Sequence, residues 1–301
     1  MKILVSGENS QLGKEFLRLK FNLKNYSFLF TDSKSMNLLD KESIRKKILS
    51  YNPDIIINFS GYTNVDSAEE NKLDCYEINA IAPGFISSLA NKIGAYFIHI
   101  STDYVFGDPA EAPFNCEANT LPVNFYGNSK LDGEKEVFNN SPSSIIIRTS
   151  SLFGIHNDNF VKSILDKILK KQSLKIVSDQ KVSMTYSLDL AKFILQIINE
   201  KDLNFIIKSN RARVIHYTNI GYTNWYDVAC HINDSISKEN QSSLITAIKL
   251  KDWKSKALRS LDTRLVIDYG LFDSLNIELY DWKVRVSRVV NELILNKVKN
   301  D

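Results

Sequence analysis

The stretch "MKILVSGENSQLGKE" at residues 1–15 decides the fold. It begins with a short run of apolar, branched residues that stops at Gly7, which is typical of a buried strand. Helical periodicity follows from Gln11, so Gly7 and Gly13 lie in the connection between a strand and a helix. A first glycine permits such a tight turn, and the free N–H groups at the helix N-terminus can receive a pyrophosphate. Ser10 stands where a further glycine is usual, and we expect it to offer its N–H and hydroxyl instead.

The same alternation of strand and helix continues to residue 150. Buried strands are predicted at 1–7, 26–32, 53–61, 94–107 and 143–150, and helices at 11–21, 41–52, 66–93 and 126–138, with an interruption at Pro83. Apolar strands that alternate with helices indicate a parallel sheet covered on both faces. We therefore predict an α/β fold for residues 1–150, a doubly wound parallel sheet of the Rossmann type that binds NAD(P).

The pattern loosens after residue 150. Helices are predicted at 157–171, 187–200 and 223–236, and a short strand at 173–179, with polar loops between them. We expect residues 151–301 to form mainly a smaller substrate-binding lobe, with some segments returning to the first domain.

Composition excludes several classes of protein. The formal net charge of the 301 residues is only +3 and the lysines are scattered, so neither nucleic acid nor a membrane surface is an expected partner. No apolar run is long enough to cross a bilayer. The chain opens on a strand rather than a secretory signal, and its three cysteines have no C-x-x-C spacing. We expect a soluble protein of the reducing cytoplasm, without a disulfide framework and without a bound metal.

Asp32 ends the second predicted strand, where a carboxylate can hydrogen-bond the ribose hydroxyls of an adenosine. Its charge would repel a 2′-phosphate, which favours NADH. Ser33 and Lys34 directly after it could accommodate that phosphate, which favours NADPH. The choice of cofactor stays open at this point, and Asp32 could also be an ordinary exposed turn residue.

Carbonyl reduction needs a proton donor near the hydride donor, and Tyr126 and Lys130 supply a candidate pair. They lie one helical turn apart in "FYGNSK", residues 125–130. A free phenol has a pKa of about 10, and a neighbouring ammonium can lower it. Thr102 and Asp103 close the strand "HISTDYVFG" and should point into the crevice at its carboxyl end. Thr102 would orient the carbonyl, whereas His99 in the same strand is expected to be packed.

Several segments together resemble the extended short-chain dehydrogenase/reductases, specifically the dTDP-4-dehydrorhamnose reductase family, over nearly the whole chain. The most specific are "STDYVF" and "YGNSKLDGE". The others are "SGENSQLGKE", "PDIIINFSGYTNVDSAE", "IIIRTSSLFG", "NFVKSIL", "DQ" at 179–180 and "TNWYDVA". The resemblance implies reduction of a nucleotide-activated 4-keto-6-deoxy hexose with NADPH or NADH, and it is compatible with a homodimer.

The resemblance also implies roles for single residues. Tyr126 would be the proton donor, Lys130 its partner and a contact of the nicotinamide ribose, and Thr102 the hydrogen-bond donor to the carbonyl. The remaining implied contacts are Gly7, Ser10, Gln11, Leu12, Gly13, Asp32, Gly61, Tyr62 and Thr63 for the cofactor, and Asp103, Ser151, Asn159 and Arg259 for the sugar nucleotide.

The chain departs from the family pattern on the substrate side. The family usually has tryptophan at Ser151, where the ring packs on the sugar nucleotide. Val182 and Met184 replace the glycine and proline of a D-Q-x-G-x-P-T segment, and Ser260 replaces the proline of an R-P pair. Losing an aromatic platform removes a large contact area. We therefore expect the reaction type to be that of the family while the sugar or nucleotide differs.

Three alternatives share these motifs. A sugar-nucleotide epimerase would use the same hydride machinery but retain its nucleotide. A 4,6-dehydratase would need an acidic pair after the threonine, and Asp103 is followed by Tyr104. A non-catalytic subunit like the regulatory partner of methionine adenosyltransferase would be favoured if the tyrosine–lysine pair were absent, and the pair is present.

Overall fold

Six parallel strands form the central sheet of the computed structural model, which describes residues 1–19, 25–198, 200–207, 213–236 and 244–298. Their order across the sheet is β10-β5-β4-β3-β1-β2. The strands are β1 (Lys2–Ser6), β2 (Ser27–Thr31), β3 (Ile55–Asn58), β4 (Tyr96–Thr102), β5 (Ser144–Thr149) and β10 (Arg213–Tyr217). Every neighbouring pair is parallel. The chain passes from one side of β1 to the other between β2 and β3, which creates a switch point where ligands bind in such sheets.

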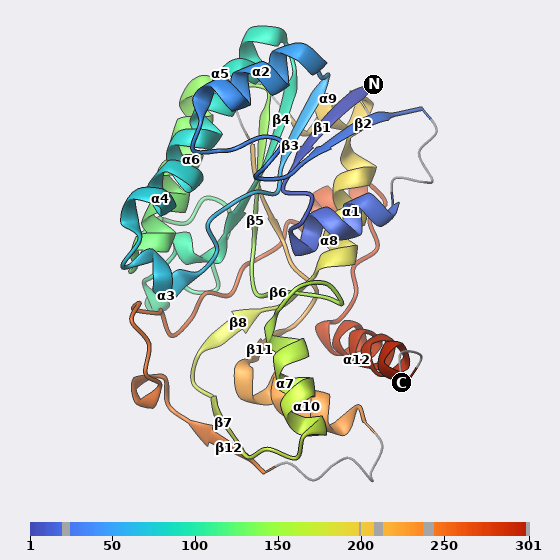
Figure 1. Cartoon of the computed structure of the whole chain (residues 1–301). Coiled ribbons are helices and arrows are strands. Elements are labelled where there is room, and N and C mark those ends of the chain that lie inside the picture. Colours follow the sequence, from blue (N-terminus) through green and yellow to red (C-terminus); the bar gives the residue numbers. More distant parts are fainter. Residues whose placement is uncertain (20–24, 199, 208–212, 237–243, 299–301) are drawn as a thin grey trace.

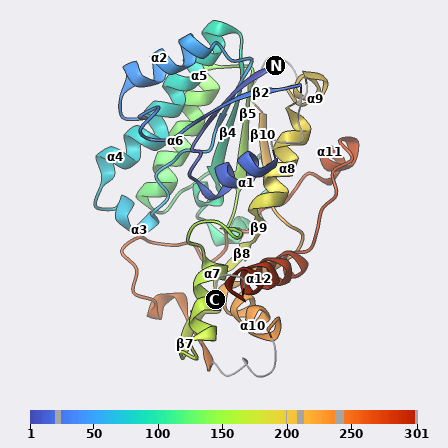
Figure 2. The same ribbon diagram turned by 45° about the vertical axis from the view of Figure 1, so that its right-hand side comes forward.

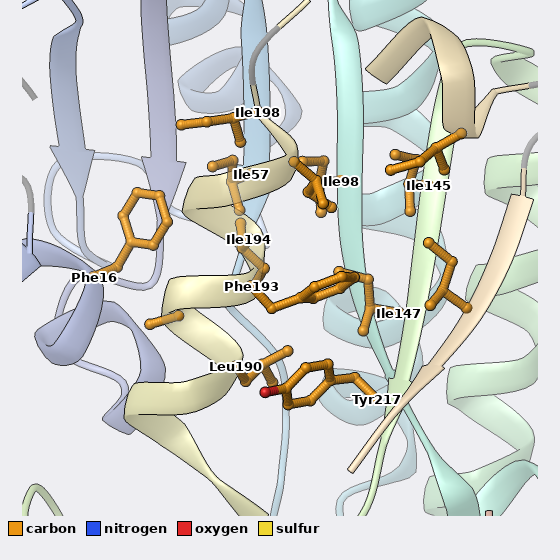
Figure 3. Packing of buried hydrophobic residues seen from close by; sticks show 14 of the residues in the cluster. Phe16, Ile57, Ile98, Ile145, Ile147, Leu190, Phe193, Ile194, Ile198 and Tyr217 are labelled. Carbon is orange, nitrogen blue, oxygen red and sulfur yellow. The ribbon is translucent and has the colours of Figure 1, made fainter. Parts of the chain in front are cut away.

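Helices cover both faces of this sheet (Figure 1). α1 (Gln11–Leu19) and α8 (Ser187–Ile197) lie on one face, and α2 (Lys41–Tyr51), α5 (Ala82–Ile93) and α6 (Phe125–Asn140) lie on the other. Successive strand residues point to opposite faces, so Ile57 packs under α8 (Figure 3) while Ile56 packs under α5. The predicted doubly covered parallel sheet is confirmed.

The helical segment predicted at 66–93 is divided differently from expectation. It consists of α3 (Val65–Ala68), α4 (Lys72–Tyr76), a π-helical turn (Glu77–Ile81) and α5. Pro83 lies in the first turn of α5, directly after the π turn, rather than at a break. Proline has no N–H to donate and is tolerated at a first turn. The break lies instead at residues 69–71, where Asn71 precedes α4.

The C-terminal lobe, as we call the second packed unit, lies below the sheet (Figures 1 and 2). One apolar cluster joins its helices and short strands and includes Leu165, Met184 and Val286. Its elements are β6 (Leu152–Phe153), α7 (Phe160–Leu169), β7 (Leu174–Val177), β8 (Lys181–Ser183), β9 (Thr185–Tyr186), β11 (Tyr222–Asn224), α10 (Trp225–Asp234), β12 (Ile245–Ile248) and α12 (Trp282–Val298). Within the ranges described, no helix is long and apolar enough to span a bilayer.

Four of the described elements after residue 150 join or pack on the sheet, and only α8 among them was predicted. β10 adds a sixth strand beside β5, where no strand was expected from the sequence. α8 packs on the sheet core together with α9 (Glu200–Ile206) and α11 (Tyr269–Ser274). The predicted ends of two helices, residues 20–21 and 199, lie outside the described residues.

Candidate functional site

A cavity of about 800 Å³ opens at the carboxyl ends of β1, β3 and β4. It extends from the end of β2 to the beginning of the C-terminal lobe. The sequence-predicted residues that line it are Gly7, Ser10, Gln11, Leu12, Asp32, Gly61, Tyr62, Thr63, Thr102, Asp103, Tyr126, Lys130 and Ser151. Most of the candidate residues therefore face one common space, although they come from six separate segments of the chain.

The glycines of the loop after β1 are required by close packing. Gly7 has φ +81°, and a Cβ there would lie 2.8 Å from the carbonyl carbon of Phe59 at the end of β3. A Cβ on Gly13 would lie 2.1 Å from the carbonyl oxygen of Gly7, so Gly13 packs the helix on the loop and does not line the cavity. Backbone approach this close is possible only for glycine.

Ser10 plays a different part from the one expected. Its N–H donates to the carbonyl oxygen of Gly7 (2.9 Å), and its hydroxyl oxygen accepts from the N–H of Gly13 (2.9 Å). The Ser10 N–H is thus used within the loop, and the hydroxyl caps α1. Gln11 and Leu12 are the first residues of α1 and line the cavity. The N–H groups of a first helical turn have no carbonyl partner in the helix, so they remain the donors for an anion.

Asp32 lies at the far end of the cavity and is held by its own turn. Its Oδ1 accepts from the N–H groups of Ser35 (2.9 Å) and Lys34 (3.2 Å) and from the Ser35 hydroxyl (2.8 Å). The hydrogen bonds from Ser35 lower the pKa of Asp32, because they stabilise the charged form. A fixed negative charge therefore faces this end of the cavity.

The segment Gly61–Thr63 after β3 is held by Asn79, which the sequence reasoning missed. Asn79 Oδ1 accepts from the N–H of Tyr62 (2.8 Å), and its Nδ2 donates to the carbonyl oxygen of Tyr62 (3.0 Å). Asn79 lies in the π-helical turn and is fully buried. The run Ile78–Ile81 is apolar except for Asn79, and a polar amide within such a run is a signal that could have found it, because buried amides need partners.

Thr102 and Tyr126 meet at the wall of the cavity. Thr102 ends β4, and Tyr126 lies in the first turn of α6, whose N-cap Asn124 accepts from the N–H of Gly127 (2.8 Å). A Cβ on Gly127 would lie 2.2 Å from the Tyr104 carbonyl oxygen, so this glycine lets the helix start pack against the 3-10 turn (Asp103–Val105) that follows β4. Burial raises the pKa of Tyr126, and a hydrogen bond with Thr102 opposes that rise. The phenol is therefore protonated at neutral pH.

Lys130 is placed differently from expectation. Its Nζ donates to the carbonyl oxygen of Ile100 (2.7 Å) and lies 3.3 Å from His99 Nε2. Burial lowers the pKa of Lys130 to about 8. The expectation that Lys130 lowers the pKa of Tyr126 is not met in this arrangement: burial of the phenol dominates and raises its pKa. His99 is buried, as expected, and it contacts Lys130 directly.

Asp103 and Ser151 lie where the cavity meets the C-terminal lobe. Asp103 is buried and accepts hydrogen bonds from the hydroxyls of Ser150 (2.7 Å) and Thr102 (3.1 Å). Burial raises the pKa of Asp103 and outweighs these bonds. Ser151 has φ +43°, a left-handed conformation that is uncommon outside glycine. The position usually occupied by a tryptophan thus carries a small side chain on a constrained backbone.

Two predicted substrate contacts have other partners and do not line the cavity. Asn159 caps α7, and its side-chain amide lies 2.8 Å from that of Gln11. Arg259 forms a two-pronged ion pair with Asp66, with distances of 3.1 and 3.3 Å. It thereby ties the segment before residue 260 to α3. In this structure both polar groups are bonded to other residues of the protein, and their roles as substrate contacts stay predictions.

Comparison with known proteins places this geometry in a family. The chain matches the model of the RmlD substrate binding domain over residues 1–295. The chain belongs to this family. Within it, the resemblance to dTDP-4-dehydrorhamnose reductases of the extended short-chain dehydrogenase/reductase group is confirmed.

The relatives match over almost their entire length. The spore coat polysaccharide biosynthesis protein SpsK of Bacillus subtilis is 30% identical over 97% of each chain. The dTDP-4-dehydrorhamnose reductase of Aggregatibacter actinomycetemcomitans is 30% identical over 94% of this chain and 96% of its own. Among solved structures, that of the Clostridium acetobutylicum dTDP-4-dehydrorhamnose reductase is 30% identical with a TM-score of 0.87, over 97% and 99% of the two chains. The Bacillus anthracis enzyme, solved in complex with NADP, is 26% identical with a TM-score of 0.85, over the same shares.

Proposed function

We propose that this RmlD-family protein reduces a nucleotide-activated 4-keto-6-deoxy sugar with NADPH or NADH, converting dTDP-4-dehydrorhamnose or a close analogue to its dTDP-L-rhamnose product for cell-surface polysaccharide synthesis. One observation carries the proposal: Thr102, Tyr126 and Lys130 line the same cavity as the glycine loop. Relatives named dTDP-4-dehydrorhamnose reductase support the choice of substrate class.

The residues present fit a dinucleotide. Gly7 packs so closely on the end of β3 that no side chain fits at this turn. The first residues of α1 line the cavity and present N–H groups to a pyrophosphate. Asp32 and the segment Gly61–Thr63 would contact the adenosine end and the path toward the nicotinamide. Bound NAD(P)H supplies the hydride in this class of reaction. Accordingly, we assign cofactor binding to residues 1–150 and sugar-nucleotide binding mainly to residues 151–301.

The residues of this chain supply the proton. Tyr126 remains protonated because its pKa is raised, so it can act as a general acid toward a carbonyl oxygen that becomes an alkoxide. Thr102 would donate a hydrogen bond to the same oxygen and orient it. Asp103 lies beside Thr102 and would touch the sugar through the edge of the cavity.

Turnover with defined substrates tests the proposal. Purified protein should consume NADPH or NADH in proportion to added dTDP-4-dehydrorhamnose, whereas an epimerase would show no net consumption. Tyr126→Phe should lower kcat by at least about two orders of magnitude, the usual scale for general acid catalysis. Cofactor affinity, measured by fluorescence titration, should stay unchanged because the ring is retained. Near-normal turnover of Tyr126→Phe, or no oxidation with dTDP-, UDP-, GDP- or CDP-linked keto sugars, would overturn the assignment.

A cytoplasmic location and a homodimer complete the proposal. The three cysteines are free thiols, which suits a reducing compartment. The homodimer is a prediction that the mass in solution tests. Light scattering on the purified protein at micromolar concentration should give twice the mass of 34.4 kDa, and a monomer mass would contradict it.

A further inference from the structure

A chain of buried polar groups runs beneath the cavity, from β3 through β4 to Lys130. Asn58 Oδ1 accepts from the N–H of Ser60 (3.1 Å) and from the Ser6 hydroxyl (2.5 Å). Asn58 Nδ2 lies 3.1 Å from His99 Nδ1, and His99 Nε2 lies 3.3 Å from Lys130 Nζ. Asn58 and His99 are fully buried, so no solvent competes for these bonds.

The direction of this chain is fixed at one end. A backbone N–H can only donate, so the N–H of Ser60 requires the oxygen of the Asn58 amide at its position. The NH₂ of Asn58 must then point at His99 and donate to Nδ1. With Nδ1 acting as an acceptor, a neutral imidazole carries its proton on Nε2. The Nε2–H of His99 therefore points at the amino group of Lys130.

An ammonium cannot accept that hydrogen bond, because it has three donors and no lone pair. The neutral amine can accept it and still donate to the carbonyl oxygen of Ile100. We propose that Asn58 and His99 are positioning residues that lower the proton affinity of Lys130, by presenting to its amino group a donor that only the neutral amine can accept.

The other groups around Lys130 do not reverse this effect. Glu134, one turn further along α6, is held by Arg148, with Nη2 of the guanidinium 2.6 Å from Oε2. Cys75 of α4 is a buried thiol whose pKa is raised by burial, so it carries no charge at neutral pH. Burial lowers the pKa of Lys130 to about 8. It acts in the same direction as the hydrogen bond that His99 offers to the neutral amine. Burial also holds the pKa of His99 well below its usual value, which keeps the ring neutral.

Asn58→Asp reverses the direction of the hydrogen bonds from residue 58 through His99 to Lys130. Aspartate has almost the same shape as asparagine. A carboxylate still accepts from Ser60 and Ser6 through one oxygen. Its second oxygen accepts a hydrogen bond from Nδ1 of His99, so the single ring proton sits on Nδ1 instead of Nε2. Nε2 then becomes an acceptor for the Lys130 ammonium. We expect the pKa of Lys130 to rise by about one unit or more, the usual scale for a new favourable partner.

Nitrogen-15 NMR of protein labelled at histidine tests this directly, since the sequence has only four histidines. Wild-type His99 should carry its proton on Nε2, with Nδ1 unprotonated. His216 is a matched internal control, because its Nδ1 faces the carbonyl oxygen of Val266 (3.2 Å) and should carry the proton. Asn58→Asp should place a proton on Nδ1 of His99. Signals are assigned with His99→Gln.

The same signals report the titration of Lys130. His99 Nε2 should shift with an inflection near pH 8 in the wild type, at a higher pH in Asn58→Asp, and without an inflection in Lys130→Met. A proton on Nδ1 of His99 in the wild-type protein would overturn the proposal. This measurement does not depend on any variant being able to fold. An inflection unchanged in a folded Asn58→Asp protein would also overturn it.

The consequence for turnover rests on the proposed function. Reduction consumes a proton. The alkaline limb of the kcat/KM profile should therefore move to higher pH in Asn58→Asp, by the same number of pH units as the Lys130 inflection measured by NMR. If NMR gives the expected tautomers but no sugar nucleotide is reduced, the proposed function fails while this inference stands. If turnover is observed but the tautomers are reversed, the inference fails alone.

Discussion

The two regions on either side of the cavity are stabilised in different ways. On the sheet side, polar groups are buried and bonded to one another, as in the chain from Asn58 to Lys130. Toward the C-terminal lobe and outside the cavity lining, Arg259 and Asp66 form a partly exposed ion pair, and the neighbouring Leu258 is 73% exposed. A buried network tolerates little change in composition, whereas an exposed rim can accept substitutions at small cost.

This difference matches where the chain departs from its family pattern. By the resemblance described above, Gly7, Thr102, Tyr126 and Lys130 would keep the pattern on the sheet side, while Ser151 would depart from it at the lobe side. Val182 and Met184 have also changed, and both are buried in the core of the C-terminal lobe rather than at the cavity. Those two substitutions therefore act on how the lobe packs, and Ser151 is the substitution that acts on the cavity surface.

Two arginines allow the difference in stability to be measured. Arg148→Met leaves Glu134 as a buried charge without its partner, so we expect the free energy of unfolding to fall by about 3–5 kcal/mol. Arg259→Met removes the half-exposed pair with Asp66 and should cost at most about 1 kcal/mol. Urea unfolding monitored by circular dichroism compares the two variants. Equal losses of unfolding free energy in the two variants would show that the two regions are stabilised to the same extent.

The sequence predicted the sheet side better than the lobe side, for a physical reason. Strand periodicity and the glycines at 7 and 13 report local conformation, so the phosphate loop and the order of Thr102, Tyr126 and Lys130 followed from the chain. Periodicity reports which face a side chain occupies, but not which side chain it meets across strands. The contacts of Asn58 and Asn79 therefore could not be read from it.

The same limit explains what the sequence could not show after residue 150. β10 is a short strand that joins the sheet only through pairing with β5, far away in sequence. Asn159 and Arg259 are polar residues in loops, where nothing local distinguishes a ligand contact from a cap or an ion pair. Only their observed partners, Gln11 and Asp66, separate the two roles.

Asp32 offers a second, smaller test on the sheet side. Asp32→Asn keeps an oxygen for the N–H groups of Ser35 and Lys34 but removes the charge. The lowered pKa means that the wild-type carboxylate is ionised at neutral pH and repels a 2′-phosphate. The ratio of kcat/KM for NADPH to that for NADH should rise about tenfold, which corresponds to about 1.4 kcal/mol.

Asp40→Asn is the matched control for that change. It removes the same charge from the N-cap of α2, which does not line the cavity, and asparagine caps a helix as well as aspartate does. Its cofactor preference should equal that of the wild type. If both variants shift the ratio alike, the effect comes from net charge rather than from a contact of Asp32.

Ser151→Trp tests the lobe side and should have the smallest effect. An indole at this position would add apolar surface against the sugar nucleotide, worth about 0.5–1.5 kcal/mol beyond simple burial. The left-handed backbone at φ +43° opposes part of that gain, because a bulky residue is strained there. We expect KM for the dTDP sugar to fall by a few fold at unchanged kcat, while Ser151→Ala stays near the wild type. Cofactor affinity should not change, since the Asp32 and glycine-loop end of the cavity is untouched. A loss of NADPH binding in Ser151→Trp, with the sugar KM unaltered, would instead place Ser151 on the cofactor side and remove the division between the two regions.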